Sequence, residues 1–140
     1  MSERFTLTFT ARPEDIDVMG HVNNAVWVRW MEAIATAHWD AVARPEDRAR
    51  YAWVVTRHEI DYRGNIAEGE SVTAETFIPE GPSGARFDRR VDFRNAVGKV
   101  IVSARTTWAM IDIATGRLCR VTPDVAAPFG PFDQDCNSAP

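Results

Sequence analysis

Residues 15–42 have the sequence DIDVMGHVNNAVWVRWMEAIATAHWDAV, in which a polar stretch passes directly into an apolar one. From about Ala25 to Val42 the chain is rich in alanine and contains neither Gly nor Pro, which favours a helix. The polar residues of this helix recur at spacings of three and four and form one stripe: Arg29, Glu32, Thr36 and Asp40. A stripe this narrow predicts a helix buried over most of its circumference, with other elements wrapped around it.

Strands are predicted on both sides of this helix. Phe5, Leu7 and Phe9 alternate with threonines, as in a half-buried strand. A charged connector, residues 44–50, follows the helix. Four β-rich segments then succeed one another, separated by turns that contain glycine: 52–62, 71–78, 86–95 and 100–113. This order predicts an α+β fold in which five antiparallel strands pack on one long helix.

The length of 140 residues fits one domain, expected over residues 1–123. Residues 124–140 are rich in Pro, Ala, Gly and Ser and are expected to form an irregular C-terminal tail. The two cysteines, Cys119 and Cys136, have no spacing typical of metal ligands, and reduced thiols are favoured over a disulfide between them. No metal site is expected.

Charge limits the classes of partner. Sixteen Lys and Arg residues against twenty Asp and Glu residues give a net charge of −4. Nucleic acids and anionic membranes attract a net basic face, so neither is expected as a partner. The chain has no apolar run near the roughly eighteen residues of a membrane-spanning helix and no signal-peptide pattern after Met1. A cytoplasmic location is therefore expected.

The polar stretch before the helix, residues 15–24, has two interpretations. In the structural one, Asn23 or Asn24 caps the helix and the acids favour its positive end. In the functional one, the unpaired N–H groups at the helix start bind the oxygen of a polarised carbonyl, while a nearby carboxylate attacks it or activates a water. Capping alone requires neither Gly20 nor His21.

The run Asp-x-Asp-x-x-Gly-His-Val-Asn-Asn and the aromatic-rich helix after it resemble the hot-dog thioesterases of the 4-hydroxybenzoyl-CoA thioesterase-like group. The run is also similar to that of acyl-ACP thioesterases. The resemblance covers about Phe5 to Gly116 and implies a hot-dog fold, in which a five-stranded antiparallel sheet wraps around one long central helix. It also implies a homodimer or dimer of dimers, with the site between subunits.

The resemblance assigns roles to single residues of the loop. Asp17 matches the catalytic carboxylate, either nucleophile or general base, and the Asn24 N–H matches the donor that polarises the thioester carbonyl. Gly20 matches the glycine that lets the backbone approach the substrate. His21 is a candidate proton carrier or water-orienting group, or else a structural loop histidine. Asn23 matches the substrate-binding part of the motif.

The chain departs from the family pattern at two places. Met19 stands where acyl-ACP thioesterases carry an asparagine. The basic run that many CoA-dependent members carry on a hairpin is absent, and Arg86, Arg89 and Arg90 follow instead. These arginines are candidates for binding the phosphates of CoA or phosphopantetheine, or they form a solvated strand face.

Other residues carry weaker hypotheses. Glu32 is the alternative catalytic carboxylate, or an ordinary helix glutamate. His38 and His58 are expected to be surface or packed histidines. Trp27 and Trp30 either line an acyl pocket or belong to the core with the other tryptophans.

The sequence therefore predicts a thioester hydrolase without metal or redox cofactor, acting on a small-molecule acyl thioester of CoA or of a carrier protein. Two alternatives come from other classes. One is a hot-dog enoyl-CoA hydratase or dehydratase, although Asp17 and His21 are four apart without the Asn-Pro of the hydratase motif. The other is a non-catalytic acyl-binding protein.

Overall fold

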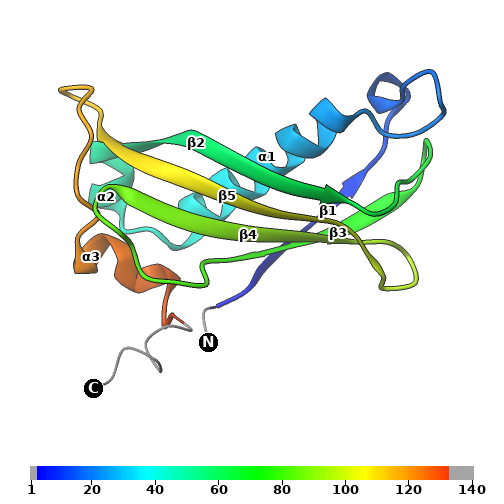
Figure 1. Cartoon of the computed structure of the whole chain (residues 1–140). Helices are drawn as coiled ribbons and strands as arrows, with labels where there is room; N and C mark the ends of the chain where they lie inside the picture. The colour runs from blue at the N-terminus through cyan, green and yellow to red at the C-terminus, as the bar shows by residue number, and fades with distance from the viewer. Residues whose placement is uncertain (1–2, 133–140) are drawn as a thin grey trace.

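The computed structural model describes residues 3–132. Within them one antiparallel sheet has the strand order β1-β3-β4-β5-β2, and a long helix packs against it (Figure 1). The predicted α+β architecture is confirmed. The elements are β1 (Phe5–Thr10), η1 (Pro13–Asp15), α1 (Asn24–Val42), α2 (Pro45–Arg50), β2 (Tyr51–Tyr62), β3 (Ser71–Phe77), β4 (Arg86–Arg94), β5 (Val100–Asp112), α3 (Pro123–Ala126) and η2 (Ala127–Phe129), where η marks one 3₁₀ turn.

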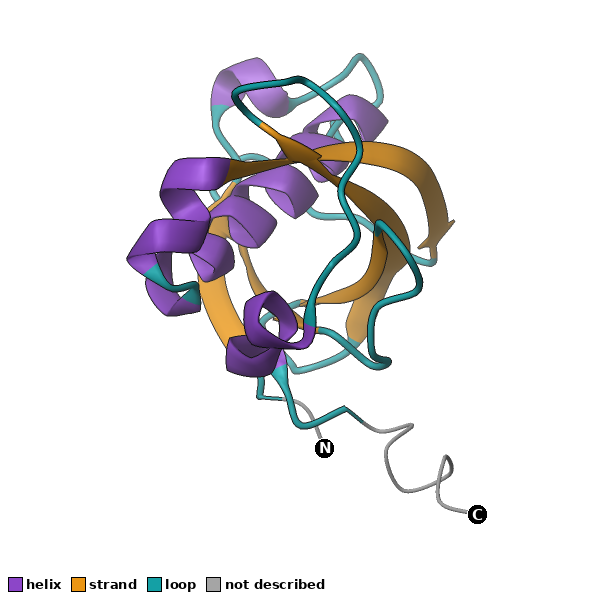
Figure 2. Ribbon diagram, turned by 90° about the vertical axis from the view of Figure 1, so that its left-hand side faces the viewer, coloured by secondary structure: helices purple, strands orange, loops and turns teal. Residues whose placement is uncertain are grey.

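The sheet is curved and curls around α1, as the hot-dog fold requires (Figure 2). Successive side chains of a strand point to opposite faces, so each strand gives alternate residues to the face that covers the helix. In β4 the residues on this inner face are all buried, while those between them are half-buried or exposed. The inner residues of β4 are Phe87, Arg89, Val91 and Phe93.

α1 begins where Asn23 caps it. Asn23 Oδ1 accepts a hydrogen bond from the Ala25 N–H at 2.9 Å. The predicted polar stripe is exposed, but so are Ala25 and Ala33 beside it. The helix is therefore buried on one side and not over most of its circumference, because the curved sheet covers only that side.

The core divides along α1. Around its N-terminal half, Trp27 and Phe93 pack edge to face with ring centroids 5.1 Å apart. Around its C-terminal half, Phe129 stacks on Trp39 with centroids 5.8 Å apart and meets Phe87 edge to face at 6.1 Å. The two halves thus bury separate aromatic clusters under one sheet.

The C-terminal segment differs from the expected irregular tail. Residues 123–129 form α3 and η2, and Thr122 Oγ1 caps α3 by accepting a hydrogen bond from the Val125 N–H. Val125 and Phe129 are buried in the second cluster, so their apolar side chains, one helical turn apart, fix the segment. Residues 133–140, the rest of the expected tail, lie outside the described residues.

β2 and β1 form the two edges of the sheet. β2 is the longer, with twelve residues against six, and its register shifts once, between Val55 and Arg57. Within the described chain β2 pairs only with β5. Its outer backbone edge is therefore open, and an open edge is a template for pairing with another chain.

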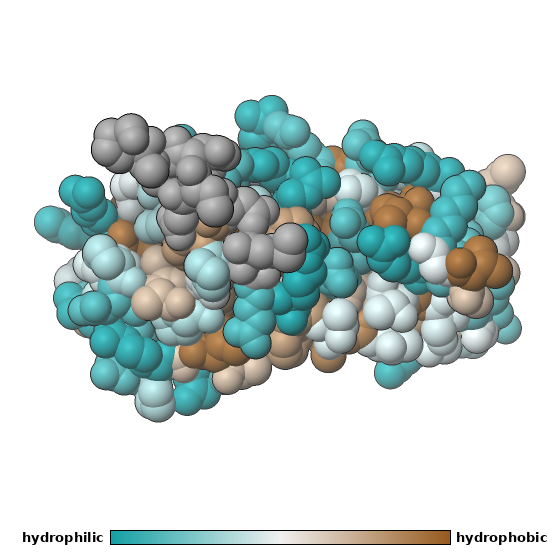
Figure 3. Space-filling view, turned by 90° about the horizontal axis from the view of Figure 1, so that it is seen from below, coloured by the Kyte–Doolittle hydropathy of each residue, from teal (hydrophilic) through white to brown (hydrophobic). Residues whose placement is uncertain are grey.

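Several expectations concern the surface and the cysteines. None of the helices within residues 3–132 has the length and apolar character needed to cross a membrane. On the face seen in Figure 3, apolar patches are small and separated by hydrophilic side chains. Cys119 is a free thiol, whereas Cys136 lies outside the described residues.

Candidate functional site

The polar loop ahead of α1 is a tight, closed turn. Ile16 and Val22 form a β-bridge at its base. Inside it, the Asp17 N–H donates to the His21 carbonyl at 2.8 Å, and the Gly20 N–H donates to the Asp17 carbonyl at 3.0 Å. Gly20 has a φ of +77°, which side chains rarely tolerate, and a Cβ there would meet nothing within 4 Å. Backbone conformation, not space, therefore requires this glycine.

The Asp17 carboxylate has one oxygen engaged and one free. Oδ1 accepts hydrogen bonds from the Met19 N–H at 2.9 Å and the His21 N–H at 3.3 Å. Oδ2 has no hydrogen-bond partner within residues 3–132, and Asp17 is only partly buried. The turn thus holds the carboxylate in place while one oxygen stays available to take a proton or to attack an electrophile.

Asp15, the other acid of the loop, has a structural role. Its side chain is buried, and Oδ2 accepts a hydrogen bond from the Arg12 N–H at 2.9 Å. Oδ1 accepts one from Arg29 Nη2 at 3.4 Å. The Asp15 carbonyl accepts one from the Asn23 N–H at 2.9 Å. Asp15 therefore fastens the loop to the helix, and both of its carboxylate oxygens are engaged.

The start of α1 adds an unpaired donor to this loop. The first N–H groups of a helix have no partner inside the helix. Asn23 satisfies two of them, because its side chain accepts from the Ala25 N–H and its carbonyl from the Val26 N–H. The Asn24 N–H has no hydrogen-bond partner within the described chain. With the positive end of the helix dipole, it can stabilise a developing negative charge.

Five of the predicted site residues meet at this loop: Asp17, Gly20, His21, Asn23 and Asn24. Asn24 supplies a backbone donor, whereas the side chain of Asn23 is engaged in capping the helix. The exposed imidazole of His21 makes no hydrogen bond within residues 3–132.

Trp27, predicted to bind substrate or to lie in the core, is a core residue in this chain. Its side chain is fully buried, with ring centroids 5.1 Å from both Trp30 and Phe93. No part of its surface is open to a ligand in the single chain.

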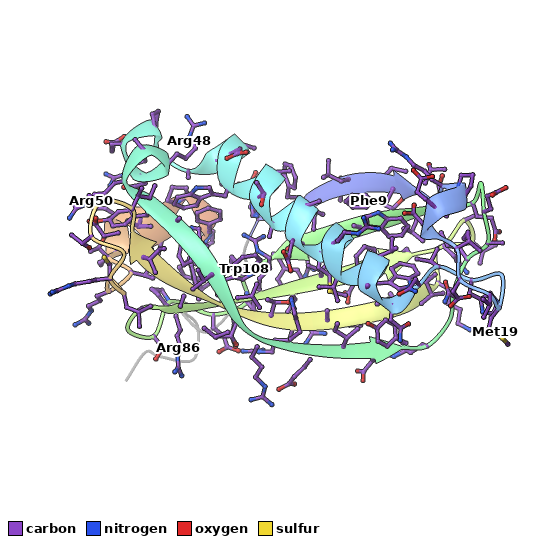
Figure 4. The ribbon with its side chains drawn as sticks, turned by 90° about the horizontal axis from the view of Figure 1, so that it is seen from above. Phe9, Met19, Arg48, Arg50, Arg86 and Trp108 are labelled. Atoms are coloured by element: carbon purple, nitrogen blue, oxygen red, sulfur yellow. The ribbon has the colours of Figure 1, made fainter. Side chains whose placement is uncertain are left out.

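The three arginines of β4 do not form the expected cluster. Arg86 begins the strand and lies at the opposite end of the molecule from Met19 of the loop (Figure 4). Arg89 faces the helix and is buried. Arg90 faces outward, where Nη2 donates to Ser103 Oγ at 3.1 Å. Because side chains alternate between the two faces of a strand, Arg89 points to the opposite face from Arg86 and Arg90. The three arginines therefore cannot bind one phosphate group together.

A cavity of about 340 Å³ opens beside the C-terminal half of α1. Arg48, which lines it, lies at the opposite end of the molecule from Met19 (Figure 4). Six of its thirteen lining residues are aromatic: Trp39, Tyr51, Trp53, Phe87, Trp108 and Phe129. The sequence does not predict this cavity, because its wall combines residues from six separate segments of the chain.

Arg89 is a buried cation in the wall of this cavity, only 6% exposed. Its Nη1 donates to His38 Nδ1 at 2.9 Å and to Thr76 Oγ1 at 3.0 Å. Burial lowers the pKa of Arg89 to about 9, and burial together with the Arg89 charge lowers the pKa of His38 to about 4. At neutral pH the guanidinium is therefore charged and the imidazole is neutral. A signal for this existed in the sequence, since Arg89 occupies an inward position between Phe87 and Val91.

Glu32, the alternative carboxylate, is exposed on α1, eight residues and about 12 Å along the helix axis from Asn24. Its Oε2 lies 3.8 Å from His58 Nε2, and His58 Nδ1 lies 2.8 Å from Thr106 Oγ1. Glu32 is thus paired with a strand histidine and separate from the loop. Within the described residues, no group of three or more His, Cys, Asp or Glu side chains is arranged to hold a metal ion.

Comparison with protein-family models gives a match to the Thioesterase-like superfamily over residues 11–129. A search of curated protein sequences gives no match.

Three similar solved structures illustrate the fold. A protein assigned as an oleoyl thioesterase from Lactobacillus plantarum has 19% identity and a TM-score of 0.81, with coverage of 91% of this chain and 51% of that one. An acyl-ACP thioesterase from Bacteroides thetaiotaomicron has 24% identity and a TM-score of 0.74, with coverage of 83% and 49%. A DHNA-CoA thioesterase from Staphylococcus aureus has 18% identity and a TM-score of 0.78, with coverage of 90% and 88%. The chain spans about half the length of the first two.

Proposed function

Because this chain belongs to the thioesterase-like superfamily, we propose that it hydrolyses an acyl thioester of coenzyme A to the free acid and the CoA thiol. One observation carries the proposal. The loop before α1 holds a carboxylate with a free oxygen, Asp17 Oδ2, and it leads into a helix whose first N–H, that of Asn24, is unpaired. A carboxylate and an oxyanion donor are the two groups that acyl transfer to water needs.

Two routes use this geometry. In the first, Asp17 removes a proton from a water that attacks the carbonyl carbon, and the resulting oxyanion accepts a hydrogen bond from the Asn24 N–H. The C–S bond then breaks and the thiolate takes the proton from Asp17. In the second, Asp17 itself attacks, the thiol leaves, and water hydrolyses the mixed anhydride. A single turnover in ¹⁸O-labelled water places label in the Asp17 side chain only by the second route.

Coenzyme A is the proposed carrier for two reasons. The Staphylococcus aureus DHNA-CoA thioesterase is similar to this chain over 88% of its own length, whereas the acyl-ACP thioesterase is similar over 49%. Met19 also stands where acyl-ACP thioesterases carry an asparagine.

We also propose that two copies share each site. In the single chain, Arg48 of the cavity wall and Met19 of the Asp17 loop lie at opposite ends of the molecule (Figure 4). β2 runs between these ends, from Tyr51 in the cavity wall to Tyr62, whose hydroxyl lies 3.5 Å from the Asn24 carbonyl. A twofold axis pairs the open β2 edges antiparallel, which sets the cavity of one copy beside the loop of its partner.

Dilution tests the shared site. The specific activity is expected to fall when sizing with light scattering shows that the dimer dissociates. A monomer with full activity contradicts the shared site, although it leaves the role of Asp17 intact.

The role of Asp17 is tested by thiol release from a panel of short, long and aromatic acyl-CoAs. Asp17→Asn keeps an oxygen for the Met19 and His21 N–H groups but removes the charge, so turnover is expected to fall roughly 10²- to 10⁴-fold with an unchanged melting temperature. Asp40→Asn, an exposed acid of α1, is the control. If Glu32→Gln abolishes turnover and Asp17→Asn does not, the proposal names the wrong carboxylate.

Hydration of an enoyl-CoA without thiol release identifies a hydratase, and binding without either reaction identifies an acyl-binding protein.

A further inference from the structure

The cavity wall is rich in hydrogen-bond donors and poor in acceptors. The charged side chains that line it are Arg48 and Arg89, and none of its lining residues is an Asp, Glu, Asn, Gln or His. The indole Nε1 atoms of Trp53 and Trp108 are buried and lack a hydrogen-bond partner within residues 3–132. These two atoms have almost no accessible surface, so a ligand in the cavity does not reach them, and the charged donors that it meets are those of Arg48 and Arg89.

Arg89 presents the clearest of these donors. A guanidinium binds a carboxylate in a bidentate pair, in which the parallel N–H groups of Nε and one Nη donate to the two oxygens. Arg44 does this on Asp47, with Nε at 2.8 Å from one carboxylate oxygen and Nη2 at 3.0 Å from the other. In Arg89 only Nη1 is engaged, on His38 and Thr76. Its Nε and Nη2 have no hydrogen-bond partner, and its charge no acidic partner, among the residues that the structure describes.

A structural role alone does not account for this arrangement. His38 and Thr76 require only a neutral donor, and a buried cation without a counterion is expensive. The Nε and Nη2 groups of Arg89 are not used by the fold. A carboxylate in the cavity would supply both the missing charge and the missing acceptors.

We infer that the cavity binds the far end of the acyl group and that this end carries a carboxylate, so that the substrates are CoA thioesters of dicarboxylic or carboxyaryl acids. The inference rests on the proposed function, because the thioester end then lies at the Asp17 loop of the partner copy. The Trp and Phe side chains of the wall pack on the apolar body between the two ends. A volume of about 340 Å³ is at the lower end of the range for small-molecule pockets and suits a short chain or a single ring.

Binding of free fragments tests the cavity without catalysis. Calorimetric titration of the full chain with benzoate is expected to show binding at least about 10-fold tighter than with benzyl alcohol, which is similar in size but uncharged. Arg89→Gln is expected to remove that preference and Arg89→Lys, which keeps the charge but loses the paired N–H groups, to reduce it. Arg94→Gln, on the outer face of the same strand, is the control. Equal binding of the two fragments, no binding of benzoate, or a preference unaffected by Arg89→Gln overturns the inference. If Arg89→Gln does not fold, the inference is tested by the preference of the wild type for benzoate over benzyl alcohol and by the reduction of that preference in Arg89→Lys.

Turnover separates this inference from the proposed function. Glutaryl-CoA and valeryl-CoA have the same chain length, and only the first has a terminal carboxylate. The wild-type kcat/KM is expected to favour glutaryl-CoA roughly 10- to 100-fold. In Asp17→Asn, benzoate binding is expected to persist while both substrates lose turnover. Hydrolysis of both thioesters at the same kcat/KM overturns the inference but leaves the catalytic proposal standing. If Asp17→Asn binds benzoate and is still active, the catalytic role of Asp17 is overturned and the carboxylate site in the cavity stands.

Discussion

Both ends of α1 leave polar groups without a partner in the described chain, but they hold these groups differently. At the N-terminal end, the loop closes on itself, with Asp17, Gly20 and His21 joined by backbone hydrogen bonds and Asp15 fully engaged. At the C-terminal end, Arg89 lines a cavity, and its Nε and Nη2 groups have no acceptor in the described chain. Under the proposed function, backbone geometry holds the reacting carboxylate at the first end, whereas the identity of one side chain, Arg89, selects the substrate at the second. Four substitutions or conditions test this division.

Loss of Phe129 should damage only the cavity end, and it should have the largest effect on stability. Phe129→Ala removes a buried ring that packs on His38, Trp39 and Phe87, so the free energy of unfolding is expected to fall by about 3–5 kcal/mol. Chemical denaturation measures it. Leu118→Ala, at an exposed position, is the control. A fall below about 1 kcal/mol would mean that the C-terminal segment adds little to the core.

Acid should also weaken the cavity end. His38 has a pKa of about 4 in the folded chain and an ordinary value of 6.5 in the unfolded one. Between these values the unfolded chain binds the extra proton, so stability is complete above pH 6.5 and falls as the pH drops towards 4. The loss is on the order of 2 kcal/mol after solvent screening. Denaturation across this range measures it, and His38→Gln should flatten this part of the profile. An unchanged profile in that variant assigns the acid sensitivity to other groups.

At the loop end, Gly20→Ala should cost activity more than stability. An alanine at a φ of +77° is strained by about 1–2 kcal/mol, although nothing within 4 Å obstructs its Cβ. The turn relieves the strain by shifting the atoms that hold Asp17, so kcat is expected to drop while the cavity end still binds benzoate. Gly116→Ala, with a φ of +71° in a distant turn, is the control for strain alone. Equal kcat in the two variants contradicts a link between this turn and the carboxylate.

The smallest effect is expected at the helix cap. Asn23→Ala removes the acceptor for the Ala25 N–H and should lower the free energy of unfolding by about 1 kcal/mol. Asn23→Asp keeps that acceptor and should restore stability. If Asn23→Asp restores stability but not KM, the side chain also contacts substrate, as the family resemblance implies for Asn23.

The sequence predicted the framework because the framework depends on local patterns. Alternation located β1, β-rich composition between turns located β4, and alanine content located α1, which begins at Asn24 against an expected start near Ala25. The loop is local as well, so the five residues predicted there meet in the structure.

Features that depend on tertiary packing were not predicted. The short helix α2, formed from the charged connector, is an exception because its signals are local: Pro45 stands in its first turn, and Arg44 just before it binds Asp47. The composition of residues 123–129 suggested a tail, yet Phe129 is anchored by rings from α1 and β4. Arg89 was grouped with Arg90 by proximity in sequence, although a strand places adjacent residues on opposite faces.

β4 is the middle strand of the sheet, hydrogen-bonded on both sides by β3 and β5. A residue at this place cannot shift to follow a new ligand, so position 89 acts on substrate choice in discrete steps. Under the inference drawn for Arg89, a substitution at this one position is expected to change which acids are accepted without changing the residues of the Asp17 loop. Duplicated copies of such a gene are therefore expected to diverge in substrate range before they diverge in the residues of the catalytic loop.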